Sequence, residues 1–166
     1  MKDAIAFEGR LYRALNPLWA GQPLSGEGAA LYGGRFNRRT VPALYCSLSP
    51  VTALREAHQA GDLQPTMLVA FDAAIDRVFD ARSSAALRRY GLTAEALADA
   101  GWRNAMIRGE PVPTQQLADA LATAGFHGVL VRSFARGTTE ADLNLVLWRW
   151  SDAAPHRLTL IDEENR

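Results

Sequence analysis

Alternating apolar and polar positions predict a strand near the start of the chain and more strands toward its end. Over residues 7–15 the alternation places four side chains on one face: Phe7, Leu11, Arg13 and Leu15. Short apolar runs predict further strands at residues 43–48, 66–72, 129–134, 143–150 and 157–161. In the run at 43–48, Tyr45 faces away from the side that carries Cys46.

Helix signals lie between these strands. Ser49 followed by Pro50 is typical of an N-cap with proline at the first helical position, and Gly61 fits the helix end. Further helices are predicted at residues 84–90 and 94–100, and from a cap at Thr114 to about Ala124. Residues 16–34 contain two prolines and five glycines and predict a long loop. Strands toward both ends with helices between them favour an α+β fold.

The helix that follows Ser49 carries Glu56 at the border between two faces. At 100° per residue, one side holds polar residues that we expect to meet water: Thr52, Arg55 and Gln59. The opposite half is apolar, and Glu56 lies beside the small residues Ala53 and Ala60. A glutamate in this position can lie at the edge of a cleft.

Composition narrows the class of protein. The 166 residues are 48% hydrophobic, which fits one globular domain over 1–166 with a polar tail after a last strand at 151–166. Equal numbers of basic and acidic residues, 18 each, give no general electrostatic signal for binding nucleic acid or an anionic membrane. No apolar run reaches the roughly 20 residues of a membrane span, and the early charges do not resemble a signal peptide. We therefore expect a cytoplasmic protein.

The number and spacing of cysteine and histidine residues argue against a disulfide and against a metal site. Cys46 is the single cysteine, so no internal disulfide can form. The three histidines and Cys46 are widely separated and make no metal-ligand cluster, so we expect no metal. Cys46 falls on the predicted core face, which favours a buried apolar role over a nucleophilic one.

Arginines are the first candidates for ligand contacts, because the guanidinium group binds phosphates and carboxylates through two parallel hydrogen bonds. Arg13 on an inward strand face needs an anionic partner, either a ligand phosphate or an internal carboxylate. The run GGRFN at residues 33–37 allows a tight turn from which Arg35 can reach an anion, although a surface turn is the alternative. We expect Arg38 and Arg39 to face solvent or a partner.

The remaining candidates have structural alternatives as well. Tyr45 would stack on a flat ring at a cleft wall, or form a second core layer. Glu56 would face a developing positive charge, or be a solvated helix residue, and His58 is expected to pack on the apolar side of the same helix. Ser133 shares a strand face with Val129 and Val131, and its hydroxyl would bind a ligand or the backbone.

Taken together, these segments resemble the RES-domain proteins, which are toxins of two-gene toxin–antitoxin modules. The resemblance covers roughly residues 10–150 and rests on LYRAL, GGRFN, ALYCSLSPVTALRE, the Trp102 region, HGVLVRS and NLVLW. The family is named for an arginine, a glutamate and a serine, which here would be Arg13 or Arg35, Glu56 and Ser133. Family members often have tryptophan where this chain has Phe36.

The resemblance implies an ADP-ribosyltransferase-like fold, with two β-sheets around an NAD-binding cleft and peripheral helices. It implies an enzyme that consumes NAD⁺ as its substrate by cleaving the nicotinamide–ribose bond, with water or phosphate as acceptor. The alternatives are a toxin that transfers ADP-ribose to a target protein of nucleotide metabolism, and a non-catalytic nucleotide-binding module. It also implies a cognate Xre-like, helix-turn-helix antitoxin as protein partner, so that the antitoxin rather than this chain would bind DNA.

Residue roles follow from the same resemblance. Arg13 and Arg35 would bind the pyrophosphate, and Tyr45 would stack on the nicotinamide or its ribose. Glu56 would stabilise the oxocarbenium-like ribose. Two further residues would position the dinucleotide: Ser133 and Asn144. Glu56, Arg13 and Tyr45 form the expected catalytic set.

Overall fold

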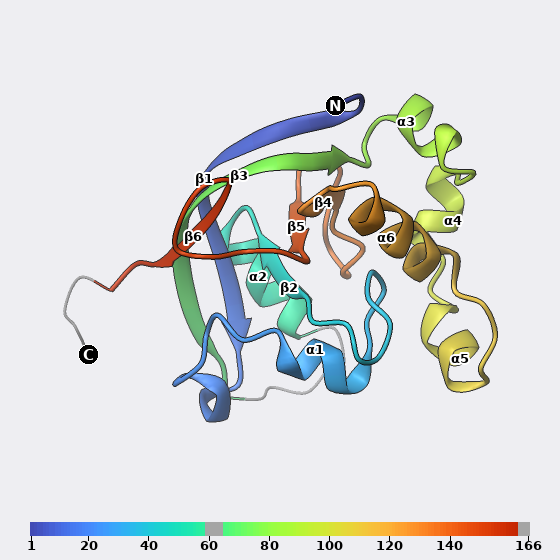
Figure 1. The fold of residues 1–166 in the computed structure, drawn as a ribbon. Coiled ribbons are helices and arrows are strands. Elements are labelled where there is room, and N and C mark those ends of the chain that lie inside the picture. Colours follow the sequence, from blue (N-terminus) through green and yellow to red (C-terminus); the bar gives the residue numbers. More distant parts are fainter. Residues whose placement is uncertain (59–64, 163–166) are drawn as a thin grey trace.

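The computed structural model describes residues 1–58 and 65–162, which form a strongly curved sheet flanked by short helices (Figure 1). The described strands are β1 (Ala4–Leu15), β2 (Leu44–Ser47), β3 (Met67–Asp80), β4 (Gly128–Arg132), β5 (Leu143–Leu147) and β6 (His156–Leu160). Their order is β1-β2-β5-β4-β3-β6, and β1 also pairs with β3. The pairing of β3 with β4 is parallel and the others are antiparallel. This is the mixed α+β architecture that the pattern predicts.

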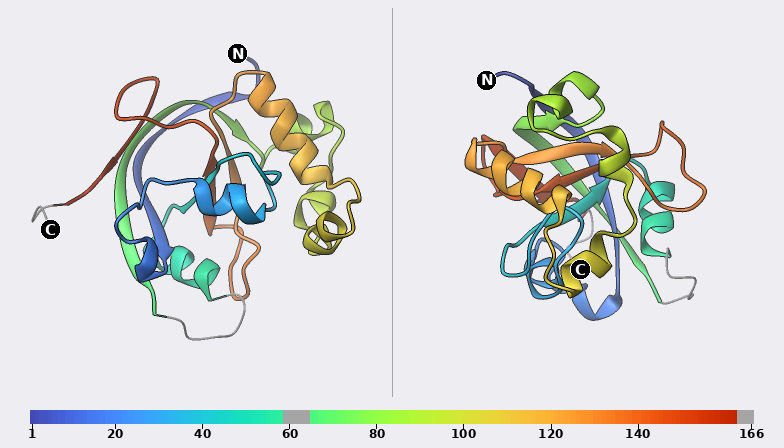
Figure 2. Two further views of the ribbon diagram at one scale, coloured as in Figure 1. Left: turned by 60° about the horizontal axis from the view of Figure 1, so that its bottom comes forward. Right: turned by 90° about the vertical axis from the view of Figure 1, so that its right-hand side faces the viewer.

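The prediction of two separate sheets is wrong for the described strands. Because β1 pairs with β2 on one side and β3 on the other, hydrogen bonds connect these strands into one sheet that closes on itself. The closure depends on the length of β3, which continues to Asp80, well beyond the predicted end at residue 72. In the left view of Figure 2, β1 and β3 curve together along the side of the molecule opposite α6.

The helices are short: η1 (Pro17–Trp19), α1 (Glu27–Tyr32), α2 (Pro50–Ala57), α3 (Ser84–Arg89), α4 (Ala94–Ala98), α5 (Trp102–Ile107) and α6 (Pro113–Thr123). Residues 16–34 are therefore not one long loop, since they contain η1 and α1, and α5 was not predicted. Thr114 does not cap α6. The N-cap is Val112 with Pro113 at the first helical position, and the side chain of Thr114 is buried.

Helix α2 begins as predicted, since the Ser49 hydroxyl accepts a hydrogen bond from the Thr52 amide and Pro50 follows the cap. The described helix ends at Ala57, and Gly61 lies outside the described residues. Its predicted wet face is confirmed for Arg55, which is exposed, and wrong for Thr52, which is 1% exposed, while Gln59 lies outside the described residues. Val51, on the predicted apolar side, is 55% exposed. Thr52 is buried because its hydroxyl donates to Asp142 Oδ1 at 2.6 Å, so the helix turns Thr52, Ala53 and Glu56 inward.

Alternation along the strands divides the core into two clusters. In β4 and β5, one face of the sheet carries Leu130, Leu145 and Leu147, which pack with Phe71 and Leu11 inside the curve. The opposite face carries Val129, Val131 and Val146, which pack with α3, α4 and α6 through Leu87, Leu97, Leu117 and Leu121. The second face also bears Tyr45, Ser47 and Asn144, so these site residues of β2 and β5 belong to the helix-covered side of the sheet. Arg13 on β1 shares the face of Leu11 instead.

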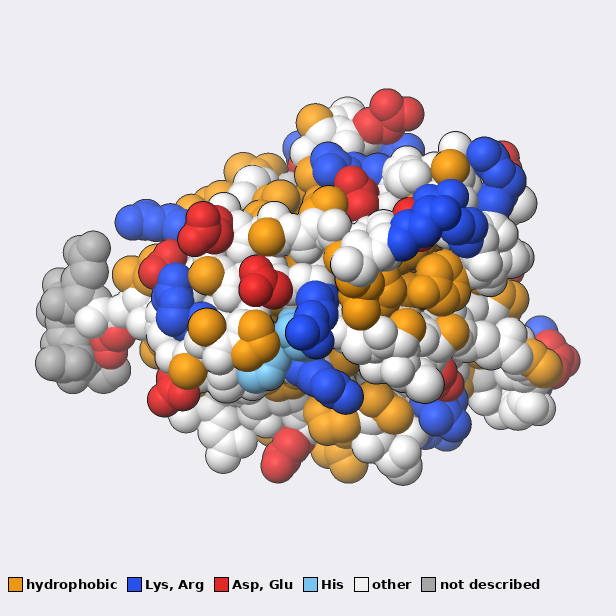
Figure 3. Space-filling model, turned by 45° about the horizontal axis from the view of Figure 1, so that its top comes forward, with side chains coloured by type: hydrophobic (Ala, Val, Ile, Leu, Met, Phe, Trp, Pro, Cys, Tyr) orange, Lys and Arg blue, Asp and Glu red, His pale blue; other side chains and the backbone are white. Residues whose placement is uncertain are grey.

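The surface carries no dominant charge on the face in Figure 3, where basic and acidic side chains are interspersed. This agrees with the balance of 18 basic and 18 acidic residues. Within the described residues, no helix is long and apolar enough to cross a membrane.

Candidate active site

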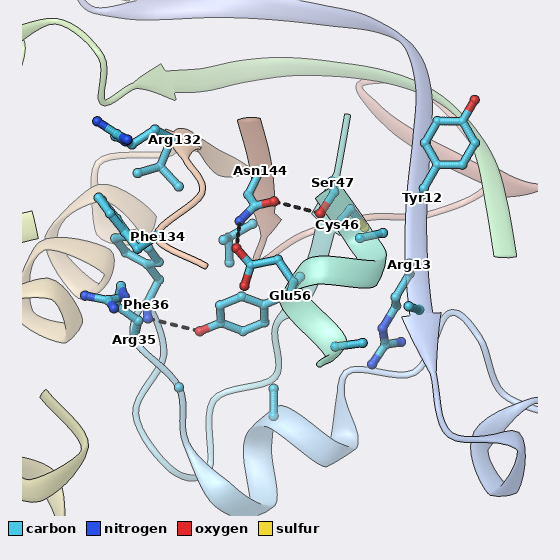
Figure 4. A pocket seen from close by; sticks show the side chains of 18 of the residues that line it. Tyr12, Arg13, Arg35, Phe36, Cys46, Ser47, Glu56, Arg132, Phe134 and Asn144 are labelled. Atoms are coloured by element: carbon cyan, nitrogen blue, oxygen red, sulfur yellow. Dashed lines mark hydrogen bonds between the residues drawn. The ribbon is translucent and has the colours of Figure 1, made fainter. Parts of the chain in front are cut away.

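A cavity of about 400 Å³ lies where four strands meet α2, within the size range of small-molecule sites. Its walls come from β1, β2, β4 and β5, from α2 and α5, and from the turn at residues 33–36. Figure 4 shows Glu56 reaching into it from α2. Most of the predicted site residues line this cavity: Arg13, Arg35, Tyr45, Glu56 and Asn144.

The carboxylate of Glu56 is fixed by two side-chain donors from distant strands. The Ser133 hydroxyl donates a short hydrogen bond to Glu56 Oε1, and Asn144 Nδ2 donates to the same oxygen at 2.7 Å. These donors lie 77 and 88 positions further along the chain. Hydrogen bonds to a carboxylate are stronger than neutral ones, so the pair holds a negative charge in one orientation at the cavity.

Ser47 completes this arrangement and was not among the predicted site residues. Its hydroxyl donates to Asn144 Oδ1 at 2.7 Å, which directs Asn144 Nδ2 toward Glu56 (Figure 4). The two residues are paired in register on β2 and β5. The alternation of β2, which places Ser47 on the face of Tyr45, was the available signal, but the pairing with Asn144 depends on the tertiary fold.

Arg13 projects from β1 into the cavity, where Nη1 donates to the backbone oxygens of Pro23 at 3.0 Å and Ser25 at 3.4 Å. Burial lowers the pKa of its guanidinium, which nevertheless stays charged. Throughout residues 1–58 and 65–162 no carboxylate forms an ion pair with Arg13, so the alternative of an internal salt bridge is not found there. A half-buried cation of this kind favours an anionic ligand.

Arg35 lies on the other side of Glu56 in Figure 4. Its Nη1 donates to the carbonyl oxygens of Leu97 at 2.9 Å and Asp99 at 2.8 Å, and its guanidinium lies 4.8 Å from the ring centre of Phe134. Burial lowers its pKa, and the charge of Glu56 partly offsets this effect. The side chain is thus anchored to the end of α4 while it lines the cavity.

Tyr45 is tied to the GGRFN turn through its hydroxyl. The hydroxyl accepts from the Phe36 amide at 3.0 Å and donates to Asn37 Oδ1 at 2.7 Å, and burial raises the pKa of the phenol. A Cβ atom at Gly34 would collide with Tyr45 Oη and Asn37 Oδ1, so glycine is required for this close approach. The ring of Tyr45 lines the cavity, whereas its hydroxyl forms hydrogen bonds to the turn.

The remaining residues considered from the sequence have structural contacts of their own. Ser133 is fully buried and does not line the cavity. Its hydroxyl donates to Glu56 and its oxygen accepts from the Ala135 amide, so Ser133 acts on a ligand only through Glu56. Cys46 is confirmed as a core residue, 2% exposed, and burial raises its pKa to about 12. Arg38 is mainly exposed but pairs with Asp119 at 2.7 Å. His58 caps the end of α2 and has a buried Nδ1.

The described residues contain no group of three histidine, cysteine, aspartate or glutamate side chains arranged to hold a metal ion. What the cavity offers is one oriented carboxylate between two arginines, with aromatic rings from Tyr45, Phe36 and Trp102 in its wall. That arrangement suits a ligand that carries both anionic groups and a cationic or cation-forming centre.

A model of the RES domain family matches residues 10–165. The chain belongs to the RES domain family. The match extends over nearly the whole chain and confirms the resemblance drawn from LYRAL, GGRFN and the Glu56 helix. No protein among curated sequences matches this RES domain.

One solved structure with a similar fold is the crystal structure of the M. tuberculosis MbcT-MbcA toxin–antitoxin complex. The superposition has a TM-score of 0.64 and 24% sequence identity, and it covers 96% of this chain and 84% of the other. At this identity the match shows that the RES domain described here shares the fold of that protein.

Proposed function

We propose that this RES domain is an enzyme that cleaves the nicotinamide–ribose bond of NAD⁺. The observation that carries the proposal is the Glu56 carboxylate, fixed by Ser133 and Asn144 in a cavity that Arg13 and Arg35 flank. NAD⁺ carries a pyrophosphate that arginines bind, and a glycosidic bond whose cleavage generates positive charge on ribose. The residues therefore fit NAD⁺ as substrate, in a cleft related to that of ADP-ribosyltransferases.

In this mechanism Glu56 stabilises the oxocarbenium-like ribose as the C–N bond breaks. The bond electrons stay with the nicotinamide nitrogen, which loses its positive charge, so the leaving group needs no general acid. Because Glu56 is already oriented by two donors, little reorganisation is required as the charge develops. Water or phosphate then forms a bond to the ribose carbon. Attack by water gives ADP-ribose and releases a proton to solvent, and attack by phosphate gives ADP-ribose-1″-phosphate.

We further propose that the chain is the toxin of a toxin–antitoxin pair, held inactive by an antitoxin protein of the Xre-like, helix-turn-helix type. Support comes from membership of the RES domain family and from the fold shared with a protein whose structure was solved as a toxin–antitoxin complex. An antitoxin that covers the cavity would exclude NAD⁺ directly.

The test is to incubate the purified protein with NAD⁺, with and without phosphate, and to follow the products by NMR. Free nicotinamide together with ADP-ribose, or with ADP-ribose-1″-phosphate, is the expected result. NAD⁺ that stays intact under both conditions contradicts cleavage by water or phosphate. Labelled NAD⁺ added to a cell lysate then separates the remaining alternatives: one labelled protein band indicates ADP-ribose transfer to a target, and none indicates a binding module.

A further inference from the structure

A second cavity, of about 390 Å³, shares lining residues with the first. Two of them, Arg132 and Phe134, lie on the opposite side of Glu56 from Arg13 in Figure 4. The lining of the second cavity comes from residues 81–82, α3, α4, the end of β4 with Phe134, and Glu140. Leu87, Leu97 and Phe134 are its largest apolar side chains, and its polar members are Arg82, Ser84, Arg132 and Glu140. Val131, Arg132 and Phe134 border both cavities. Phe134 is held in this wall by Arg35, which stacks on its ring and bonds to the carbonyl oxygen of Leu97.

Arg132 is the cation at this shared wall. Its Nε is buried and has no hydrogen-bond partner, and no carboxylate in the described part of the chain forms an ion pair with it. A buried N–H without an acceptor is costly, so the position favours a ligand oxygen. Figure 4 shows the Arg132 side chain beside Phe134 and directed away from Glu56.

We propose that the second cavity is the subsite for the adenosine half of the dinucleotide, with Arg132 binding a phosphate oxygen at the junction. This proposal rests on the proposed function and states how the substrate lies. NAD⁺ consists of two nucleotides joined by a pyrophosphate, and the protein offers two adjoining cavities of similar volume with an unpaired arginine between them. The apolar side chains of the second cavity suit a purine ring, whereas Glu56 faces only the first.

This orientation places the pyrophosphate on the Arg35 and Arg132 side of Glu56. Arg13, on the opposite side in Figure 4, is then not the principal phosphate ligand. The two halves of the substrate would bind in separate places, so each should be measurable with its own mononucleotide. AMP represents the adenosine half, and nicotinamide mononucleotide represents the other.

The experiment uses calorimetric titration of the full chain with AMP and with nicotinamide mononucleotide. Ala94 lines the second cavity from α4, whereas Ala98 lies on the same helix, is exposed and lines neither cavity. Ala94→Trp should weaken AMP binding about tenfold or more, because the indole fills the subsite, and should leave nicotinamide mononucleotide binding unchanged. Ala98→Trp is the matched control and should change neither.

Arg132→Gln tests the phosphate contact separately. It should weaken AMP binding about tenfold, as expected for loss of a charge-assisted hydrogen bond, while binding of adenosine stays the same. The proposal is overturned if AMP does not bind the wild-type protein, if AMP displaces nicotinamide mononucleotide, or if both tryptophan variants bind AMP equally well. These titrations need no turnover, so a protein that binds AMP as described but leaves NAD⁺ intact contradicts the proposed reaction and keeps the subsite.

Discussion

Replacing Ser133 by alanine tests whether this serine acts through Glu56 or contacts the dinucleotide itself. The substitution removes one of the two donors to Glu56 Oε1 and leaves Asn144 as the other. A hydrogen bond to a charged group contributes about 1.5–3 kcal/mol, which corresponds to a fall in kcat of roughly 10- to 150-fold if the bond is fully used in the transition state. KM for NAD⁺ should stay nearly constant, since Ser133 is fully buried and lies outside the cavity wall.

The same substitution has a stability cost that can be measured independently. The Ala135 amide loses its acceptor, Ser133 Oγ, at a position where Ala135 is 5% exposed. An unsatisfied buried donor costs about 1–3 kcal/mol, so Tm should fall by about 2–12 °C for a chain of this size. Steady-state nicotinamide release at a temperature well below Tm separates the two effects, with circular dichroism as the check on folding.

Ser133→Thr serves as the control, because it keeps a hydroxyl at the same position and should restore much of kcat. A rise in KM of tenfold or more with unchanged kcat would show that Ser133 binds the substrate directly. Full kcat in folded Ser133→Ala would also contradict this role of Ser133, because Glu56 would then not depend on this donor.

Three further predictions follow from the same contacts. Ser47→Ala should lower kcat by about 2- to 10-fold, because it removes one neutral hydrogen bond that orients Asn144. Ser47→Thr should restore kcat. A change confined to KM would contradict the role of Ser47 in orienting Asn144. Gly34→Ala should lower Tm and activity together, because its Cβ collides with Tyr45 Oη. Gly28→Ala in α1, which has open space around it, is the control and should leave both unchanged. Equal Tm values for the two variants would refute this prediction. Hydrogen bonds from Thr52 and Thr139 hold the pKa of Asp142 below its usual value of 3.8, so the ionised carboxylate stabilises the fold fully above that pH and progressively less below it. In thermal melts from pH 6 to pH 3, Asp142→Asn should therefore lose less Tm on acidification than the wild-type protein. Identical curves of Tm against pH would contradict this role of Asp142.

The sequence predicted correctly those features that depend only on neighbouring residues in the chain. Ser49 and Pro50 begin α2 because an N-cap and a proline act within one helical turn. Cys46 was placed in the core because alternation along β2 is a property of the strand itself. The RES resemblance joined Glu56, Ser133 and Asn144 in one site, and the structure brings these three together.

What the sequence did not predict depends on partners far along the chain. Thr52 looked like a surface residue because its partner, Asp142, lies 90 positions away. The closure of the sheet depends on the pairing of β1 with the long β3, which the short apolar run at 66–72 did not indicate. The anchoring of Arg35 by α4 and of the Tyr45 hydroxyl by Asn37 are likewise tertiary contacts.

The role of Glu56 as the electrostatic stabiliser is tested most directly by the turnover of NAD⁺ by Glu56→Gln beside Glu95→Gln. Glutamine at position 56 can still accept from Ser133 and Asn144, so the variant should fold and bind NAD⁺, but it lacks the negative charge. We expect its kcat to fall by roughly 10²-fold or more, the range for removal of an electrostatic stabiliser, while Glu95→Gln, on the exposed first turn of α4, turns over NAD⁺ normally. Near-normal turnover by folded Glu56→Gln would contradict this role of the carboxylate.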